Sequence, residues 1–193
     1  MTLWRDLPDR RYDVILADPP WSYYGSQGKW GAAAKFYATA PDEAIGSLPI
    51  PDLLAPRGVL FLWATSPRLD VAMACLAAWR LHFRGVAFVW VKTRNDGVPI
   101  GAQGVRPSIV KPTTEYVLAA SRVAKGRPMP LGDEGVSNTV LAPKRAHSQK
   151  PEAVRAQIER LYPHASRLEL FARSERPGWD SWGNEVGTLN AAE

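Results

Sequence analysis

A short apolar run that stops at two consecutive prolines is the feature that most restricts how this chain can fold. Residues 12–17, Tyr-Asp-Val-Ile-Leu-Ala, have the length and composition of a buried strand. Asp18-Pro19-Pro20-Trp21 follows at once, and proline fixes φ and lacks the N–H that a strand ladder needs. An acid, two rigid residues and an aromatic ring are therefore predicted just beyond the carboxyl end of a strand, where open α/β sheets bind ligands.

The rest of the chain alternates between strand and helix patterns. Apolar runs predict further strands at 59–64, 86–91, 115–120, 136–141 and 168–172. Helices are predicted from Pro41, from 66 to about 80 and from 151 to 161. This alternation indicates a mostly parallel sheet with helices on both faces.

The helix predicted from residue 66 has a clear start signal. Ser66 is expected to be its N-cap, and Pro67 occupies the first helical position. Helical spacing predicts that Leu69, Met73, Leu76 and Ala77 share its buried face.

Long irregular segments separate several of these elements. We expect one domain over residues 1–193, with loops at about 22–40, 94–112 and 121–135 and a disordered tail at 186–193. The first two loops leave strand ends and should surround the Asp18 turn. All three are expected to supply contacts to a substrate, and basic residues are frequent in the last two.

The composition narrows the classes of partner and chemistry. The formal net charge is +5, which favours a polyanionic partner such as nucleic acid. A single cysteine excludes an internal disulfide framework, and no apolar run is long enough to span a membrane, so we expect a cytoplasmic protein. Three scattered histidines and one cysteine give no zinc pattern, and glycine-rich phosphate-binding motifs are absent.

Asp18 and its neighbours suit the exocyclic amine of a nucleobase. The lone pair of the adenine 6-amino group is delocalised into the ring, so the amine is a poor nucleophile. The Asp18 carboxylate and the Pro19 carbonyl are expected to accept its two N–H bonds, which would localise that lone pair and aim it at an electrophile. Trp21 is expected to stack on the base. The alternative interpretation is an ordinary turn aspartate before a Pro-Pro break.

Ordered motifs give the chain a family resemblance. It resembles the DPPW-type adenine-N(6) methyltransferases, the MT-A70 family, from about residue 12 to residue 185. The matching segments occur in the family's order: 18–21, 36–39, 61–65, 90–93, Glu115, 148–151, 158–161, 169–173 and 182–185. The resemblance implies a Rossmann-like α/β sandwich in permuted order, with the catalytic tetrapeptide preceding the cofactor-binding segment. It also implies that S-adenosylmethionine is the cofactor; the scattered histidines and the single cysteine predict no metal site.

The same resemblance assigns the candidate site residues. Asp18, Pro19, Pro20 and Trp21 would be catalytic. Asp18 and Lys150 would hold the methionine end of the cofactor, Arg173 and Glu185 its ribose, and Asn184 its adenine. Tyr37, Trp63, Lys92 and Glu115 would flank the substrate together with Trp21. Trp63 also fits a core position, and Lys150 could simply precede a helix. The segment 174–178 departs from the family pattern, which leaves the ribose contacts open.

We therefore expect methylation of the 6-amino group of adenine in DNA. The base would be flipped out of a duplex or met in a single strand. RNA adenosine is the alternative substrate, and a non-catalytic nucleic-acid-binding subunit is the alternative role. A small-molecule amine methyltransferase is disfavoured by the basic loops. A homodimer or a partner subunit fits either role.

Overall fold

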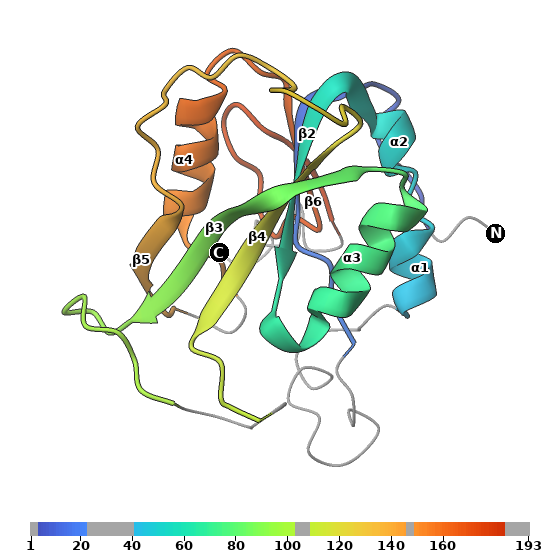
Figure 1. Cartoon of the computed structure of the whole chain (residues 1–193). Helices are drawn as coiled ribbons and strands as arrows, with labels where there is room; N and C mark the ends of the chain where they lie inside the picture. Colours follow the sequence, from blue (N-terminus) through green and yellow to red (C-terminus); the bar gives the residue numbers. More distant parts are fainter. Residues whose placement is uncertain (1–3, 23–40, 103–108, 146–148, 184–193) are drawn as a thin grey trace, which may run out of the picture.

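A computed structural model of the chain shows a seven-stranded sheet with the order β5-β3-β4-β2-β1-β6-β7 (Figure 1). The structure describes residues 4–22, 41–102, 109–145 and 149–183. The strands are β1 (Tyr12–Ala17), β2 (Leu54–Ala64), β3 (His82–Thr93), β4 (Thr114–Ser121), β5 (Thr139–Pro143), β6 (Arg167–Leu170) and β7 (Asp180–Trp182). The helices are α1 (Asp42–Gly46), α2 (Ile50–Leu53), α3 (Leu69–Ala78) and α4 (Glu152–Leu161), and a 3-10 turn, η2 (Ser66–Arg68), precedes α3.

The strand directions confirm a mostly parallel sheet. β4 runs antiparallel to both of its neighbours, β2 and β3, whereas the other pairings in the sheet are parallel. The carboxyl ends of β1, β2 and β3 therefore meet the amino end of β4 at one edge, which we call the Asp18 edge. The opposite edge, where β4 ends, is called the far edge. In Figure 1 the chain leaves β1 at the bottom of the view and leaves β4 at the top.

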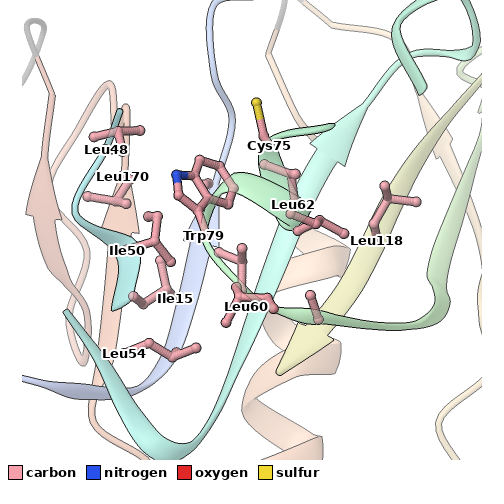
Figure 2. Packing of buried hydrophobic residues seen from close by; sticks show 14 of the residues in the cluster. Ile15, Leu48, Ile50, Leu54, Leu60, Leu62, Cys75, Trp79, Leu118 and Leu170 are labelled. Atoms are coloured by element: carbon pink, nitrogen blue, oxygen red, sulfur yellow. The ribbon is translucent and has the colours of Figure 1, made fainter. Parts of the chain in front are cut away.

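Helices cover both faces of the sheet, as the alternation of elements predicted. Alternate residues of a strand point to opposite faces. In β2, Leu60 and Leu62 pack with α1 and α3, whereas Phe61 and Trp63 pack with α4. Figure 2 shows the first of these cores, in which Trp79 lies among leucine and isoleucine side chains. The fold is thus the expected Rossmann-like α/β sandwich.

Two short elements have no counterpart in the sequence prediction. The four-residue α2 and the three-residue β7 are too short to show a hydrophobic period. Tertiary contacts hold β7 in place: Tyr12 Oη donates a 2.5 Å hydrogen bond to Asp180, and the Ala172 N–H donates to the Trp182 carbonyl at 2.9 Å. The segment after residue 172, for which no element was predicted, therefore adds a strand beside β6.

Predicted element bounds differ most where a strand continues past a proline. β2 begins at Leu54 rather than at residue 59, and its register with β1 shifts between Tyr12 and Val14. This irregularity lets the strand contain Pro56, which cannot donate to a regular ladder. The last strand ends at Leu170 rather than at residue 172, and Phe171 adopts a left-handed conformation with φ 63°.

The start of the helix at 66–80 was predicted wrongly, and its buried face was predicted correctly only for Leu76 and in part for Leu69. Ser66 lies inside η2 and makes no capping bond, and α3 begins only at Leu69. Met73 and Ala77 are exposed, whereas Ala72, Cys75 and Leu76 are buried. Because nearly every residue of this helix is apolar, the sequence pattern alone did not decide which face packs on the sheet.

The direction of β4 separates loop 121–135 from the other two loops. Segment 121–135 leaves the carboxyl end of β4, so it lies at the far edge and not around the Asp18 turn. It packs there against the end of α4, where the Gly132 N–H donates to the Leu161 carbonyl at 2.8 Å. The described parts of loop 94–112 do lie at the Asp18 edge, and loop 22–40 falls almost entirely outside the described residues. In the parts of the chain that the structure describes, no helix is long and apolar enough to cross a membrane.

Candidate active site

Asp18 is the first residue beyond β1, and backbone bonds fix the turn that follows it. The Asp18 N–H donates to the Leu170 carbonyl of β6 at 3.4 Å, and the Trp21 N–H donates to the Pro19 carbonyl at 2.8 Å. The second bond closes a three-residue turn. A carbonyl oxygen has two lone pairs, so Pro19 retains acceptor capacity for a ligand.

Trp21 is placed differently from the open stacking surface that the sequence suggested. Its side chain belongs to the buried core, with 4% of the residue exposed, and its indole N–H donates to the Trp63 carbonyl at 3.0 Å. A ring buried in this way offers no free face to a base. In this structure Trp21 instead anchors the Asp18 turn to the end of β2.

Four charged side chains from four separate segments meet beside this turn. Lys150 Nζ lies 2.9 Å from Asp18 Oδ1 and 3.3 Å from Glu115 Oε2. Lys92 Nζ lies 2.6 Å from Glu115 Oε1. The charges alternate in the order Lys92, Glu115, Lys150, Asp18, and we call this set the charge row. Sequence reasoning had named all four residues, and the fold brings them into one contiguous group.

Because the charge row is largely buried, its four charges interact strongly with one another. The four side chains are between 13% and 22% exposed, so solvent screens their charges only partly. Burial raises the pKa of Asp18, and the neighbouring Lys150 ammonium opposes this rise without cancelling it. Burial acts to lower the pKa of Lys150, but Asp18 and Glu115 together outweigh it and raise the pKa. Burial acts to raise the pKa of Glu115, but Lys150 and Lys92 outweigh it and lower the pKa.

Two tryptophan rings lie next to the ammonium groups of Lys150 and Lys92. Lys150 Nζ lies 5.3 Å from the ring centroid of Trp63, and Lys92 Nζ lies 5.0 Å from that of Trp90. The two rings meet edge to face, with centroids 6.2 Å apart. Trp63 is therefore both a core residue and part of the site. In the sequence, Trp90 was noted only as part of the segment 90–93. Trp90 lies two residues before Lys92 on one strand, and this spacing indicates that both side chains share a face.

A second buried ion pair, which the sequence reasoning missed, lies close to Asp18. Arg155 Nε donates to Glu169 Oε2 at 2.8 Å, and Arg155 Nη2 contacts the other oxygen of the same carboxylate. Burial acts to lower the pKa of Arg155, but Glu169 outweighs it and raises the pKa, with a smaller contribution from Asp18. An acid inside the apolar run of β6 was the signal that could have indicated a buried partner.

The remaining predicted residues divide into two groups. Arg173 lies near enough for its charge to act on Asp18, where it opposes the rise in pKa. Tyr37, Asn184 and Glu185 lie outside the described residues, so their assigned roles stay predictions. Gly183, just before Asn184, sits against backbone: a Cβ there would lie 2.2 Å from the Ala172 carbonyl oxygen. Only glycine fits at this position, so the chain entering the Asn184 segment is closely constrained.

The charge row contains both ammonium and carboxylate groups. It therefore suits a zwitterionic ligand that binds beside a neutral amine. A buried ammonium attracts a carboxylate, and a carboxylate with a raised pKa accepts hydrogen bonds from amines well. No group of three potential metal-ligating side chains occurs among the described residues. The Asp18 edge of the sheet therefore holds side chains of both charges, which can bind a ligand that carries both an ammonium and a carboxylate group.

A family model and several known proteins match most of this chain. The family model MT-A70 matches residues 12–185. The type II methyltransferase M.MunI of a Mycoplasma species is 32% identical over 199 residues, which cover 93% of this chain and 80% of that protein.

Two human proteins are similar at slightly lower identity. The N(6)-adenine-specific methyltransferase METTL4 is 30% identical, over 92% of this chain and 38% of its own length. The N(6)-adenosine-methyltransferase catalytic subunit METTL3 is 30% identical, over 93% of this chain and 29% of its own length. The chain thus spans well under half of each human relative but most of the Mycoplasma one.

Proposed function

Because the chain belongs to the MT-A70 family, we propose that it transfers a methyl group from S-adenosylmethionine to the 6-amino group of adenine in DNA. One observation carries the proposal: Asp18 at the end of β1 is held 2.9 Å from the buried ammonium of Lys150. The two side chains have charges opposite to those of the ammonium and carboxylate groups at the methionine end of the cofactor. The described residues thus fit this cofactor.

Each group of the charge row has a distinct role in this proposal. S-adenosylmethionine would supply a methyl group made electrophilic by its sulfonium. Lys150 would attract the cofactor carboxylate, and Arg173 would lie toward the ribose. Glu115, held by Lys92, would keep a negative charge beside Lys150 and so maintain its ammonium form.

Asp18 would act on the amine of the base. Its raised pKa makes the carboxylate a stronger hydrogen-bond acceptor for the amine N–H. The amine that takes up the methyl group would lose one proton, and Asp18 would accept that proton or pass it to water.

Two alternatives stay open beside the DNA reaction. RNA adenosine is one, because several relatives, human METTL3 among them, are named as adenosine methyltransferases. DNA is favoured because M.MunI, of which the chain spans 80%, is named as a type II methyltransferase. A non-catalytic nucleic-acid-binding subunit is the other alternative, and the intact charge row disfavours it.

The deciding experiment identifies the methylated nucleoside. The protein is incubated with isotopically labelled S-adenosylmethionine and a panel of single-stranded and duplex DNA and RNA, and the digested products are analysed by mass spectrometry. We expect labelled N(6)-methyl-deoxyadenosine, and a rate at least about a hundredfold lower for Asp18→Asn, the loss typical of a removed acid–base group. A labelled methyl group found only in adenosine would identify RNA as the substrate. No labelled nucleoside with the wild-type protein would contradict the enzymatic proposal.

A further inference from the structure

Five exposed basic side chains gather at the far edge of the sheet, around the segment that follows β4. They are Arg57, Arg84, Arg122, Lys125 and Arg127. We call this set the far-edge cluster. Its members come from β2, β3 and the segment after β4, so only the fold brings them together.

Hydrogen bonds to backbone carbonyls hold the far-edge cluster together. The Arg84 guanidinium donates to the Ala124 carbonyl at 2.7 Å and also contacts those of Val123 and Gly126. Arg57 Nη2 donates to the Arg127 carbonyl at 3.2 Å. Because one guanidinium contacts three neighbouring backbone oxygens, the conformation of residues 123–126 is fixed. The position of Lys125 within this segment is thereby fixed as well.

These contacts orient the cations without neutralising them. A carbonyl oxygen carries no net charge, so each guanidinium keeps its full positive charge. Buried arginines elsewhere are matched with carboxylates, as Arg155 is with Glu169. In the far-edge cluster, Arg127 alone has an ion-pair partner among the described residues, the exposed Glu134. The result is a surface of preorganised and largely uncompensated positive charge.

The far-edge cluster lies well away from the charge row. Glu115 stands near the start of β4, and Arg122 follows its end. Seven residues of extended strand correspond to about 24 Å. Because duplex DNA rises about 3.4 Å per base pair, this separation is about seven base pairs. A duplex extending one helical turn beyond a base at the Asp18 edge is long enough to reach the far edge.

We propose that the far-edge cluster binds nucleic-acid phosphates as a docking surface separate from the catalytic edge. This inference rests on the proposed function, because it takes nucleic acid as the polyanion. Phosphate contacts position a nucleic acid without reading its sequence. The cluster would therefore contribute affinity and orientation, whereas the loops at the Asp18 edge would select the base.

The test measures binding of a fluorescent 30-base-pair duplex at several salt concentrations without a methyl donor. Arg122→Gln/Lys125→Gln removes two charges and spares Arg57 and Arg84, which hold the segment after β4; Arg122 itself donates one hydrogen bond, to the Pro51 carbonyl at 3.3 Å. Arg5→Gln/Lys144→Gln removes two exposed charges away from the far edge, one beside the end of β7 and one after β5, as a control for charge alone. Arg122→Lys keeps the charge. Thermal unfolding of each variant checks that the fold is retained.

We expect the slope of log K, the association constant, against log salt to become less steep by about 2 in the Arg122→Gln/Lys125→Gln pair. Binding should weaken by up to about eightfold per lost contact at about 0.1 M salt. Arg122→Lys should bind like the wild type, and the control pair should keep the wild-type slope. An unchanged slope, or an equal loss in the control pair, would overturn the proposal. Absence of methyl transfer by the wild type would contradict the proposed function instead, and would leave these binding data interpretable.

Discussion

Replacing Lys150 by methionine should make the stability of this protein depend on pH in a specific direction. The substitution preserves side-chain length but leaves Asp18 and Glu115 facing each other without the ammonium between them. Since Lys150 Nζ is 2.9 Å from one carboxylate and 3.3 Å from the other, their oxygens are at most about 6 Å apart. At that distance two unit charges repel by about 3 kcal/mol with an effective dielectric constant of about 20.

This repulsion would be relieved by protonating one carboxylate. Glu115 still has Lys92 at 2.6 Å, so Asp18 should take up the proton. Removing the ammonium removes the strongest influence that lowers the pKa of Asp18, so the pKa rises further above its usual value, while burial and Glu115 continue to raise it. A carboxyl group whose pKa is raised on folding contributes stability at low pH that is lost as pH rises through the folded-state pKa. The variant should therefore lose stability as pH rises above the usual pKa of an aspartate, about 4.

Urea denaturation at pH 5 and pH 8 measures this effect. Relative to the wild type, Lys150→Met should be about 2–3 kcal/mol more destabilised at pH 8 than at pH 5. Arg94→Gln is the control, because it removes a cation from the exposed pair with Asp96 and should cost less than about 1 kcal/mol at both pH values. A destabilisation by Lys150→Met that is equal at both pH values, or greater at pH 5, would refute the electrostatic reasoning.

Three further predictions test other parts of the structure. Glu169→Gln removes the buried carboxylate partner of Arg155, leaves it the half-exposed Glu152 at 3.3 Å, and should cost about 3–5 kcal/mol in urea denaturation, whereas Glu134→Gln at an exposed pair should cost less than about 1 kcal/mol. Gly183→Ala places a Cβ against the Ala172 backbone and should weaken binding of S-adenosylmethionine in calorimetry, whereas Gly101→Ala meets open space and should bind normally. Burial raises the pKa of Cys75 to about 11; its thiol should resist alkylation at pH 8 until urea unfolds the chain, and rapid alkylation of the native protein would contradict its burial.

Much of the site could be predicted because its residues follow strand ends. Asp18 and Lys92 come directly after or at the end of apolar runs, and parallel strands bring such ends to one edge. Trp21 was harder to predict, since an aromatic residue after Pro-Pro can face solvent or core equally well, and only the contact with the Trp63 carbonyl decides. Arg155 and Glu169 are far apart in sequence, and nothing local indicates that they pair.

The sequence by itself determined the alternation of strands and helices, the turn at Asp18 and the identity of the charged residues. These depend on local periodicity and on proline, which act over a few residues. The tertiary structure alone decided the reversed direction of β4, and with it the separation of the charge row from the far-edge cluster. The physical reason is that strand direction depends on long-range pairing: the apolar run of β4 has the same pattern whichever way the strand runs.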